Sequence, residues 1–252
     1  MPLLTNHIAV VTGAGSGIGR AIALGYAREG AHVVALDANK DTAAATAQQI
    51  LNAGGKADSF ALDVTRREDC VAMARQIADK VGKVTILVNN AGIVGRNGMT
   101  GADDAVIRDW ENIIAVNLTG VFNVTHAFLG SLRANKGRIV NIGSIQSFLH
   151  LRTPSSPAYT ASKHGVLGFT KALAAELATK GVTVNAIAPG YIGTDMVMAI
   201  REDIRQGIID TVPMKRLGRP DEIGDLCAYL ASDKAAYITG ATININGGLH
   251  MC

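Results

Sequence analysis

Short apolar runs rich in Val and Ile alternate with amphipathic stretches along almost the whole chain, and this alternation most constrains its fold. The runs are continuously apolar, as expected for parallel strands that are covered on both faces. The stretches between them have helical periodicity and are long enough to serve as crossover connections. The pattern therefore predicts an α/β fold, a doubly wound parallel sheet flanked by helices on both faces. The expected strands are 7–12, 32–36, 59–62, 85–88, 138–142, 183–188 and 242–245, and the expected helices are 18–29, 40–53, 67–81, 104–132, 158–180 and 220–232.

No linker rich in Pro, Ser or charge divides the 252 residues, and no internal repeat is present. This length suits one large α/β domain with a well-buried core, so we expect a single domain over residues 1–252. Segment 191–219 breaks the alternation because it is long, locally helical and mixes Met, Ile and Arg. Its place near the end of a late strand predicts a substrate lid.

The composition argues against several classes of protein. A net charge of +3 with dispersed charges predicts neither a nucleic-acid partner nor a membrane surface, and no apolar run approaches the length of a membrane span. The six histidines show no close ligand spacing, so we expect no metal. Cys70, Cys227 and Cys252 are few and widely spaced, and no signal peptide precedes them. They are expected to be free thiols in a reducing cytoplasm.

A glycine-rich loop directly follows the first expected strand and opens the first helix, with the sequence Thr-Gly-Ala-Gly-Ser-Gly-Ile-Gly over residues 12–19. Glycines let the backbone approach a pyrophosphate, whose charge is met by the helix N-terminal amides. A glycine cluster alone is weak evidence, but the strand–loop–helix context is correct. The residues expected to bind the cofactor here are Gly13, Ser16, Gly17, Ile18 and Gly19.

Asp37 ends the second expected strand, 18 residues after Gly19. A carboxylate at this place accepts hydrogen bonds from the adenosine ribose hydroxyls and repels a 2′-phosphate. Ser16 and Ala38 offer no compensating positive charge, and Arg20 and Lys40 are less well placed. The alternative is that Asp37 only caps a turn. We predict NAD(H) as the cofactor, with NADP(H) the less favoured form.

Tyr159 and Lys163 are four residues apart, so on a helix they lie on one face. A phenol normally titrates near pH ~10, and lowering its pKa to about 7 requires roughly 4 kcal/mol from neighbouring positive charge. A tyrosine paired in this way can exchange a proton with an alcohol or an alkoxide. An isolated pair with this spacing is more often a solvated helix face, so the interpretation depends on the motifs around it.

Taken together, these motifs resemble those of the short-chain dehydrogenase/reductase family over essentially the whole chain. The markers are the 12–19 loop, Asp63-Val64, residues 89–92 (Asn-Asn-Ala-Gly), Asn117, Ser144, Tyr159, Lys163 and Pro189-Gly190. The resemblance implies a Rossmann-type fold and an oxidoreductase that acts on a ketone or a secondary alcohol. It also implies a homotetramer built on the long helices 104–132 and 158–180 and on the last strand.

The resemblance also implies roles for individual residues. Tyr159 is the expected general acid/base, Lys163 holds the nicotinamide ribose and lowers the pKa of the tyrosine, and Ser144 bonds the substrate oxygen. Asn117 is expected to hold a water that relays protons. The further expected cofactor contacts are Asp63, Val64, Asn90, Ala91, Gly92, Pro189, Gly190, Ile192 and Thr194, and the expected substrate contacts are Ser144, Gln146, Tyr159 and Tyr191.

The substrate is less well defined by the sequence. The C-terminal third resembles acetoacetyl-CoA reductases, and Lys215, Arg216 and Arg219 are candidate partners for coenzyme A phosphates, with a solvated basic turn as the alternative. Asp37 and the long 146–157 loop after Ser144 instead resemble NAD-dependent dehydrogenases of sugars and polyols. We favour a short 3-oxoacyl group or small ketone over a sugar or polyol. A protein that binds NAD(H) without catalysis is the remote alternative.

Overall fold

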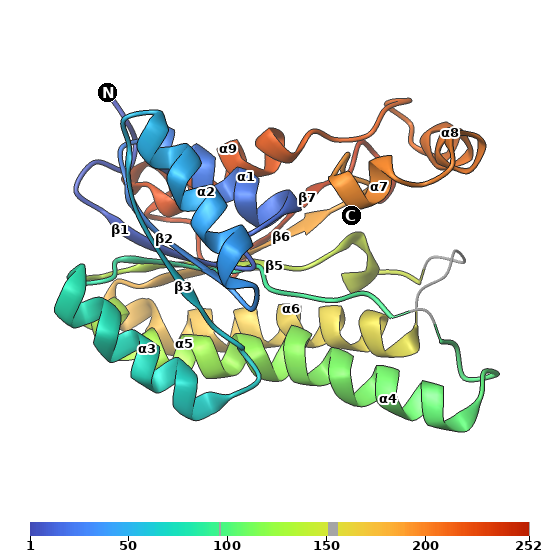
Figure 1. Cartoon of the computed structure of the whole chain (residues 1–252), viewed down its shortest axis with the longest axis horizontal. Helices are drawn as coiled ribbons and strands as arrows, with labels where there is room; N and C mark the ends of the chain where they lie inside the picture. The colour runs from blue at the N-terminus through green and yellow to red at the C-terminus, as the bar shows by residue number, and fades with distance from the viewer. Residues whose placement is uncertain (96, 151–155, 252) are drawn as a thin grey trace.

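The computed structural model describes residues 1–95, 97–150 and 156–251. Seven parallel strands form one sheet in the order β3-β2-β1-β4-β5-β6-β7 (Figure 1). The order reverses direction between β1 and β4, which makes that place the switch point of a doubly wound sheet. The predicted fold class is confirmed. The strands are β1 (Ile8–Thr12), β2 (His32–Asp37), β3 (Lys56–Ala61), β4 (Ile86–Asn89), β5 (Arg138–Ile142), β6 (Thr183–Pro189) and β7 (Thr242–Ile245).

Helices cover both faces of the sheet, as Figure 1 shows. One face carries α1 (Gly17–Arg28), α2 (Lys40–Asn52) and α9 (Pro220–Ala231). The other face carries α3 (Arg67–Lys80), α4 (Asp103–Ile114), α5 (Gly120–Ala134) and α6 (Pro157–Leu177). Each layer buries its own apolar cluster against the sheet. The short α7 (Asp195–Met198) and α8 (Glu202–Thr211) lie beyond the carboxyl end of β6.

The third strand differs from its prediction, since it runs from Lys56 to Ala61 and not over 59–62. β3 is an edge strand whose residues are all exposed or half-buried, and it pairs only with β2, from His32↔Lys56 to Asp37↔Ala61. Its sequence therefore lacks the continuous apolar run by which the other strands were recognised. Pairing with β2 fixes its bounds, whereas local sequence does not.

The expected helix over 104–132 contains a π-turn that the sequence does not predict. Residues Ala115–Thr119 form it between α4 and α5, and the Gly120 N–H donates to the Ala115 carbonyl five residues earlier. The resulting helix, Asp103–Ala134, is long and apolar enough to cross a membrane, which corrects our expectation about apolar runs. Here it packs against α3 and α6 in the layer under the sheet, as the core helix of a globular domain does.

Both described cysteines, Cys70 and Cys227, are buried free thiols, whereas Cys252 lies outside the described residues. Within the described ranges, no three His, Cys, Asp or Glu side chains lie together in a way that could hold a metal.

Candidate active site

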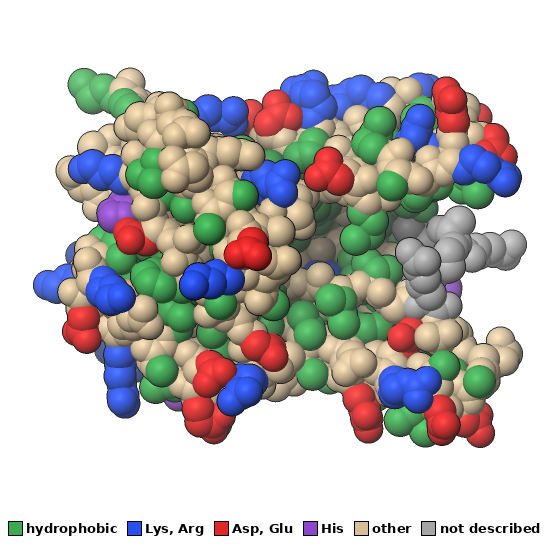
Figure 2. Space-filling model, viewed as in Figure 1, with side chains coloured by type: hydrophobic (Ala, Val, Ile, Leu, Met, Phe, Trp, Pro, Cys, Tyr) green, Lys and Arg blue, Asp and Glu red, His purple; other side chains and the backbone are tan. Residues whose placement is uncertain are grey.

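A cavity of about 520 Å³ opens at the carboxyl edge of the sheet, beside the β1–β4 switch point. Figure 2 shows it as a hollow that runs between the α7–α8 side of the molecule and the α4 side, with apolar side chains along it. This is where open α/β sheets bind their ligands. It brings together most of the residues that the sequence singles out: Gly13, Ser16, Gly17, Ile18, Gly19, Asp37, Asp63, Val64, Asn90, Ala91, Gly92, Ser144, Tyr159, Lys163, Pro189, Gly190 and Thr194.

The glycine loop has the geometry that a dinucleotide pyrophosphate requires. Gly13 has a φ of +62°, and a Cβ there would stand 2.9 Å from the Ala91 Cα. A Cβ on Gly19 would collide with the Gly13 carbonyl oxygen and the Asn90 amide. Ser16 precedes α1 without capping it through its side chain, so the first amides of α1 keep their donors for a ligand. The loop therefore fits a dinucleotide cofactor.

Asn90 holds this loop against the end of β4. Its Nδ2 donates to the carbonyl oxygens of Thr12 at 3.0 Å and Gly13 at 3.1 Å. In return, the Thr12 hydroxyl accepts from the N–H groups of Asn90 at 3.0 Å and Ala91 at 3.1 Å. The two strands at the switch point are thus joined by side-chain hydrogen bonds beyond their ladder, which fixes the floor of the cavity.

Asp37 stands at the end of β2 with both carboxylate oxygens engaged. Oδ2 accepts from the Gly15 N–H at 2.9 Å, and Oδ1 accepts from the Asn39 N–H at 2.9 Å. Asp63, after β3, lines the same part of the cavity. Among the described lining residues, Lys163 is the only cation. The nearby Arg20 does not line the cavity, and its guanidinium donates to the Gly15 carbonyl oxygen at 2.6 Å. The part of the cavity lined by Asp37 and Asp63 is therefore acidic.

Ser144, Tyr159 and Lys163 meet at the other end of the cavity. Ser144 follows β5, and its hydroxyl is hydrogen-bonded to the Tyr159 hydroxyl. Tyr159 and Lys163 lie one turn apart on α6, as predicted, with the Lys163 Nζ 5.7 Å from the centre of the tyrosine ring. This Nζ donates to the Ile142 carbonyl at 2.8 Å.

Burial controls the ionisation of both groups. It raises the pKa of Tyr159 above its ordinary value, and the hydrogen bond from Ser144 opposes that shift. It lowers the pKa of Lys163 to about 8, which leaves the ammonium largely protonated at neutral pH. The net shift for Tyr159 runs opposite to the lowering we expected from Lys163. The reason is that the phenol is desolvated, while the ammonium is turned to a carbonyl oxygen.

Asn117 lies within the π-turn, fully buried, and does not line the cavity. Its Oδ1 accepts from the Ile93 N–H at 2.8 Å, and its Nδ2 donates to the Ile93 carbonyl at 2.9 Å. It therefore holds the segment after β4 in place. Nothing in the sequence around Asn117 distinguishes this structural role from the proton relay that we expected.

Other predicted residues also lie away from the main cavity. Tyr191 and the buried Ile192 line a second cavity of about 260 Å³, next to the end of β7. Gln146 is buried, and its Oε1 accepts from the Thr160 hydroxyl at 3.0 Å. In the long loop after Ser144, Leu151 and Arg152 fall outside the described residues, whereas the His150 Nδ1 lies 3.1 Å from the Thr160 hydroxyl.

Several lining residues were missed by sequence reasoning. Most are chain neighbours of predicted residues, and all but Asp195 are apolar or glycine, which gave no chemical signal. They are Leu36, Ala38, Leu62, Ile93, Val94, Val116, Ile142, Gly143, Asp195 and Met196. Ile93, Val94 and Met196 are also exposed, so the mouth of the cavity is apolar.

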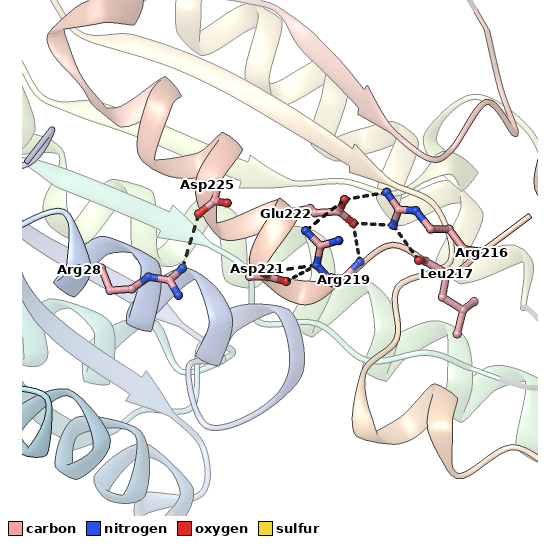
Figure 3. Close-up of polar contacts among 7 residues, drawn as sticks. All are labelled: Arg28, Arg216, Leu217, Arg219, Asp221, Glu222 and Asp225. Carbon is pink, nitrogen blue, oxygen red and sulfur yellow. Dashed lines mark hydrogen bonds and ion pairs between the residues drawn. The ribbon is translucent and has the colours of Figure 1, made fainter. Parts of the chain in front are cut away.

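Two of the three basic residues at the base of segment 191–219, Arg216 and Arg219, form ion pairs (Figure 3). Arg216 donates twice to the Glu222 carboxylate, at 2.8 and 2.9 Å, and Arg219 contacts both Asp221 and Glu222. These contacts hold the pKa of Glu222 low, at about 2. Lys215 donates to the Asp210 carbonyl at 2.7 Å. The turn closes the base of the segment, which argues against the coenzyme A role that we considered for it.

Comparison with known proteins agrees with this geometry. A family model described as enoyl-(acyl carrier protein) reductase matches residues 13–250. Nodulation protein G of Azospirillum brasilense is 52% identical over 249 residues, which cover 98% of this chain and 99% of that protein. The chain belongs to the short-chain dehydrogenase/reductase family. The 3-oxoacyl-(acyl-carrier-protein) reductase FabG of Escherichia coli is 42% identical over 247 residues, 98% of each chain.

Solved structures similar to this chain include dehydrogenases of sugar acids. A provisionally assigned NAD(P)-dependent gluconate 5-dehydrogenase from Beutenbergia cavernae with bound NADP is 40% identical, with a TM-score of 0.90 and 99% of both chains covered. A provisionally assigned 2-deoxy-D-gluconate 3-dehydrogenase from Agrobacterium tumefaciens, also with NADP, is 39% identical, with a TM-score of 0.86 and 98% of both chains covered. The protein is thus an NAD(P)-binding oxidoreductase that acts on a secondary alcohol or a ketone.

Proposed function

We propose that the protein is an NAD(H)-dependent oxidoreductase that interconverts a ketone and a secondary alcohol through Ser144, Tyr159 and Lys163. The observation that carries this proposal is that the Ser144 and Tyr159 side chains line one cavity together with the Lys163 ammonium, which lies one helical turn from the tyrosine. The glycine loop lines the same cavity, where the first amides of α1, uncapped by the Ser16 side chain, are available as donors to a pyrophosphate.

In the reducing direction, the Ser144 and Tyr159 hydroxyls hold the substrate carbonyl oxygen, and the bound nicotinamide supplies the hydride. Tyr159 gives its proton to that oxygen, and the Ser144 hydroxyl and the Lys163 ammonium stabilise the phenolate that remains. Oxidation of the alcohol uses the same groups in reverse. We assign to Asn117 the support of a proton-relaying water, in addition to its bonds with Ile93.

We propose NADH rather than NADPH as the preferred cofactor, although the two solved relatives described above hold NADP. The preference rests on the Asp37 carboxylate, with Asp63 lining the same cavity and with Arg20 bonded to the Gly15 carbonyl and absent from the described lining residues. A 2′-phosphate would meet negative charge there, whereas ribose hydroxyls would meet acceptors.

For the substrate, we propose a short 3-oxoacyl group or a small ketone. The similarity to 3-oxoacyl reductases supports it, and so does the mouth of the cavity, where Ile93, Val94 and Met196 expose apolar side chains that suit an alkyl group. A sugar or polyol is the second candidate, which the solved gluconate dehydrogenases favour.

A substrate panel separates the two candidates. We expect kcat/KM for acetoacetyl-CoA with NADH to exceed kcat/KM for any polyol or aldonic acid with NAD⁺. We also expect kcat/KM for acetoacetyl-CoA to be higher with NADH than with NADPH. Absorbance at the NADH band, followed at matched enzyme concentrations, measures all of them. Turnover confined to polyols or sugar acids would replace the first substrate by the second, while leaving the catalytic residues as proposed.

We also propose a homotetramer. Ile107, Trp110 and Phe122 on the Asp103–Ala134 helix are exposed, and β7 leaves one edge of the sheet unpaired within the described chain. Closed symmetric association would bury both surfaces. Light scattering of the eluting protein is expected to give four times the 26.2 kDa chain mass, and a mass of one or two chains would contradict the assignment.

A further inference from the structure

Two short segments carry the proposed catalytic groups, and side-chain hydrogen bonds join them. Ser144 begins the 3₁₀ turn Ile145–Ser147 after β5, whereas Tyr159 and Lys163 belong to α6. The strand end itself is held by the Gly143 N–H, which donates to the Ile187 carbonyl at 2.8 Å. The relative position of the Ser144 and Tyr159 hydroxyls therefore depends on how this 3₁₀ turn is attached to α6.

Ser147 makes that attachment at the turn of α6 that holds the lysine. Its hydroxyl accepts from the Ser144 N–H at 3.1 Å and donates to the Lys163 carbonyl at 2.9 Å. The side chain is buried, with 3% of its surface exposed. It does not line the main cavity, so it has no direct route to a substrate.

The orientation of Ser144 follows from the same turn. The Ser144 Oγ accepts from the Gln146 N–H at 3.1 Å, so its own proton is left to donate towards Tyr159. A second link, from the Thr160 hydroxyl to the Gln146 Oε1 at 3.0 Å, ties the outer side of the turn to α6. Ser147 is the inner link and the one that contacts Ser144 itself.

We propose that Ser147 is a positioning residue for the oxidoreductase reaction, which holds the Ser144 hydroxyl in register with Tyr159 and Lys163. The inference rests on the proposed roles of these three groups. A hydroxyl is needed because the position must both accept from an amide and donate to a carbonyl. Alanine would leave the buried Ser144 N–H without its partner and free the turn to shift.

The test is a steady-state comparison of Ser147→Ala with wild type in both reaction directions, on whichever ketone–alcohol pair the panel identifies. We expect kcat to fall on the order of 10- to 100-fold, because small displacements of aligned groups carry costs of this size. NADH affinity, measured by fluorescence titration, should stay within about twofold, since the glycine loop and Asp37 are untouched. Ser147→Cys, which keeps a weaker donor and acceptor, should lie between the two.

A pH profile separates positioning from a merely structural role. The Ser144 hydrogen bond favours the Tyr159 phenolate, so loosening it should raise the pKa of Tyr159. Oxidation needs the phenolate, and its rate profile should therefore move to higher pH in Ser147→Ala. The matched control is Ser131→Ala on α5, which removes a similar hydroxyl-to-carbonyl bond, to Val84 at 2.9 Å, far from the cavity. It should lower the melting temperature without moving the profile.

A Ser147→Ala enzyme with the wild-type kcat and pH profile would overturn the inference. If Ser144→Ala and Tyr159→Phe retain turnover as well, the proposed function itself fails. If only Ser147→Ala retains it, the proposed function stands and Ser147 is an ordinary packing residue.

Discussion

Tyr159→Phe is expected to lower kcat by roughly 10³- to 10⁴-fold in both directions, the range that general acid–base catalysis supplies together with a lost hydrogen bond to the reacting oxygen. The substitution removes only the hydroxyl that meets Ser144 and leaves the ring beside Lys163. NADH should still bind, because the pyrophosphate and adenosine contacts lie at the other end of the cavity. Single-turnover kinetics and fluorescence titration measure the two effects separately.

Tyr26→Phe is the matched control for this variant. Tyr26 is also buried, and its hydroxyl donates to the Cys227 carbonyl at 3.2 Å between α1 and α9, away from the cavity. Losing that bond should cost about 1 kcal/mol of stability and leave kcat unchanged. Wild-type turnover by Tyr159→Phe would exclude the tyrosine as the proton donor.

The wild-type pH dependence follows from the same group. Burial raises the pKa of Tyr159, so at neutral pH the phenol is protonated and is ready to act as an acid. Reduction should therefore be favoured at neutral pH and fall as the pH rises through that pKa, whereas oxidation should rise. Tyr159→Phe should lack this ionisation in both profiles.

The second large effect is expected at Asp37, where Asp37→Asn should raise kcat/KM for NADPH on the order of 10- to 100-fold and lower it for NADH. Two unit charges about 4 Å apart interact by roughly 4 kcal/mol near a protein surface, which sets the scale of the repulsion that the substitution removes. Asparagine keeps the shape of the side chain and one acceptor, so it retains one of the two hydrogen bonds from the Gly15 and Asn39 amides and loses the other. Adding Ala38→Arg supplies a partner for the phosphate and should extend the change.

Asp41→Asn provides the control for charge alone. Asp41 lies in the first turn of α2, exposed and outside the cavity, and it carries the same charge as Asp37. It should change neither cofactor constant by more than about twofold, because exposed charges are screened. A wild-type enzyme that already prefers NADPH would contradict our assignment of Asp37.

The sequence predicts the sheet and most of the cavity because both depend on local signals. Buried strands are recognisable as continuous apolar runs. The glycine loop is recognisable by its spacing at the end of a strand, and the Tyr159–Lys163 pair by its spacing along a helix. β3 was misplaced because an edge strand has no such run. The π-turn was missed because no local pattern marks it; Asn117 within it bonds through its amide to Ile93, 24 residues earlier in the chain.

The sequence also could not predict the connections between the proposed catalytic groups. Ser147 and Thr160 are ordinary hydroxyl residues in the sequence, and only the packing of the 3₁₀ turn on α6 shows what they join. The direction of the Tyr159 pKa shift was wrong for a related reason. Helical spacing gives the distance to Lys163, but not the burial of the phenol or the carbonyl that draws the lysine away.

The strand order also affects how the chain can fold while it is being synthesised on the ribosome. β1 is made first, yet its inner neighbour β4 follows more than seventy residues later, so its central edge stays unpaired throughout that interval. Such distant pairings delay folding and leave apolar edges open to wrong partners. Nascent chains should therefore acquire nucleotide affinity only after residue 89 has cleared the exit tunnel.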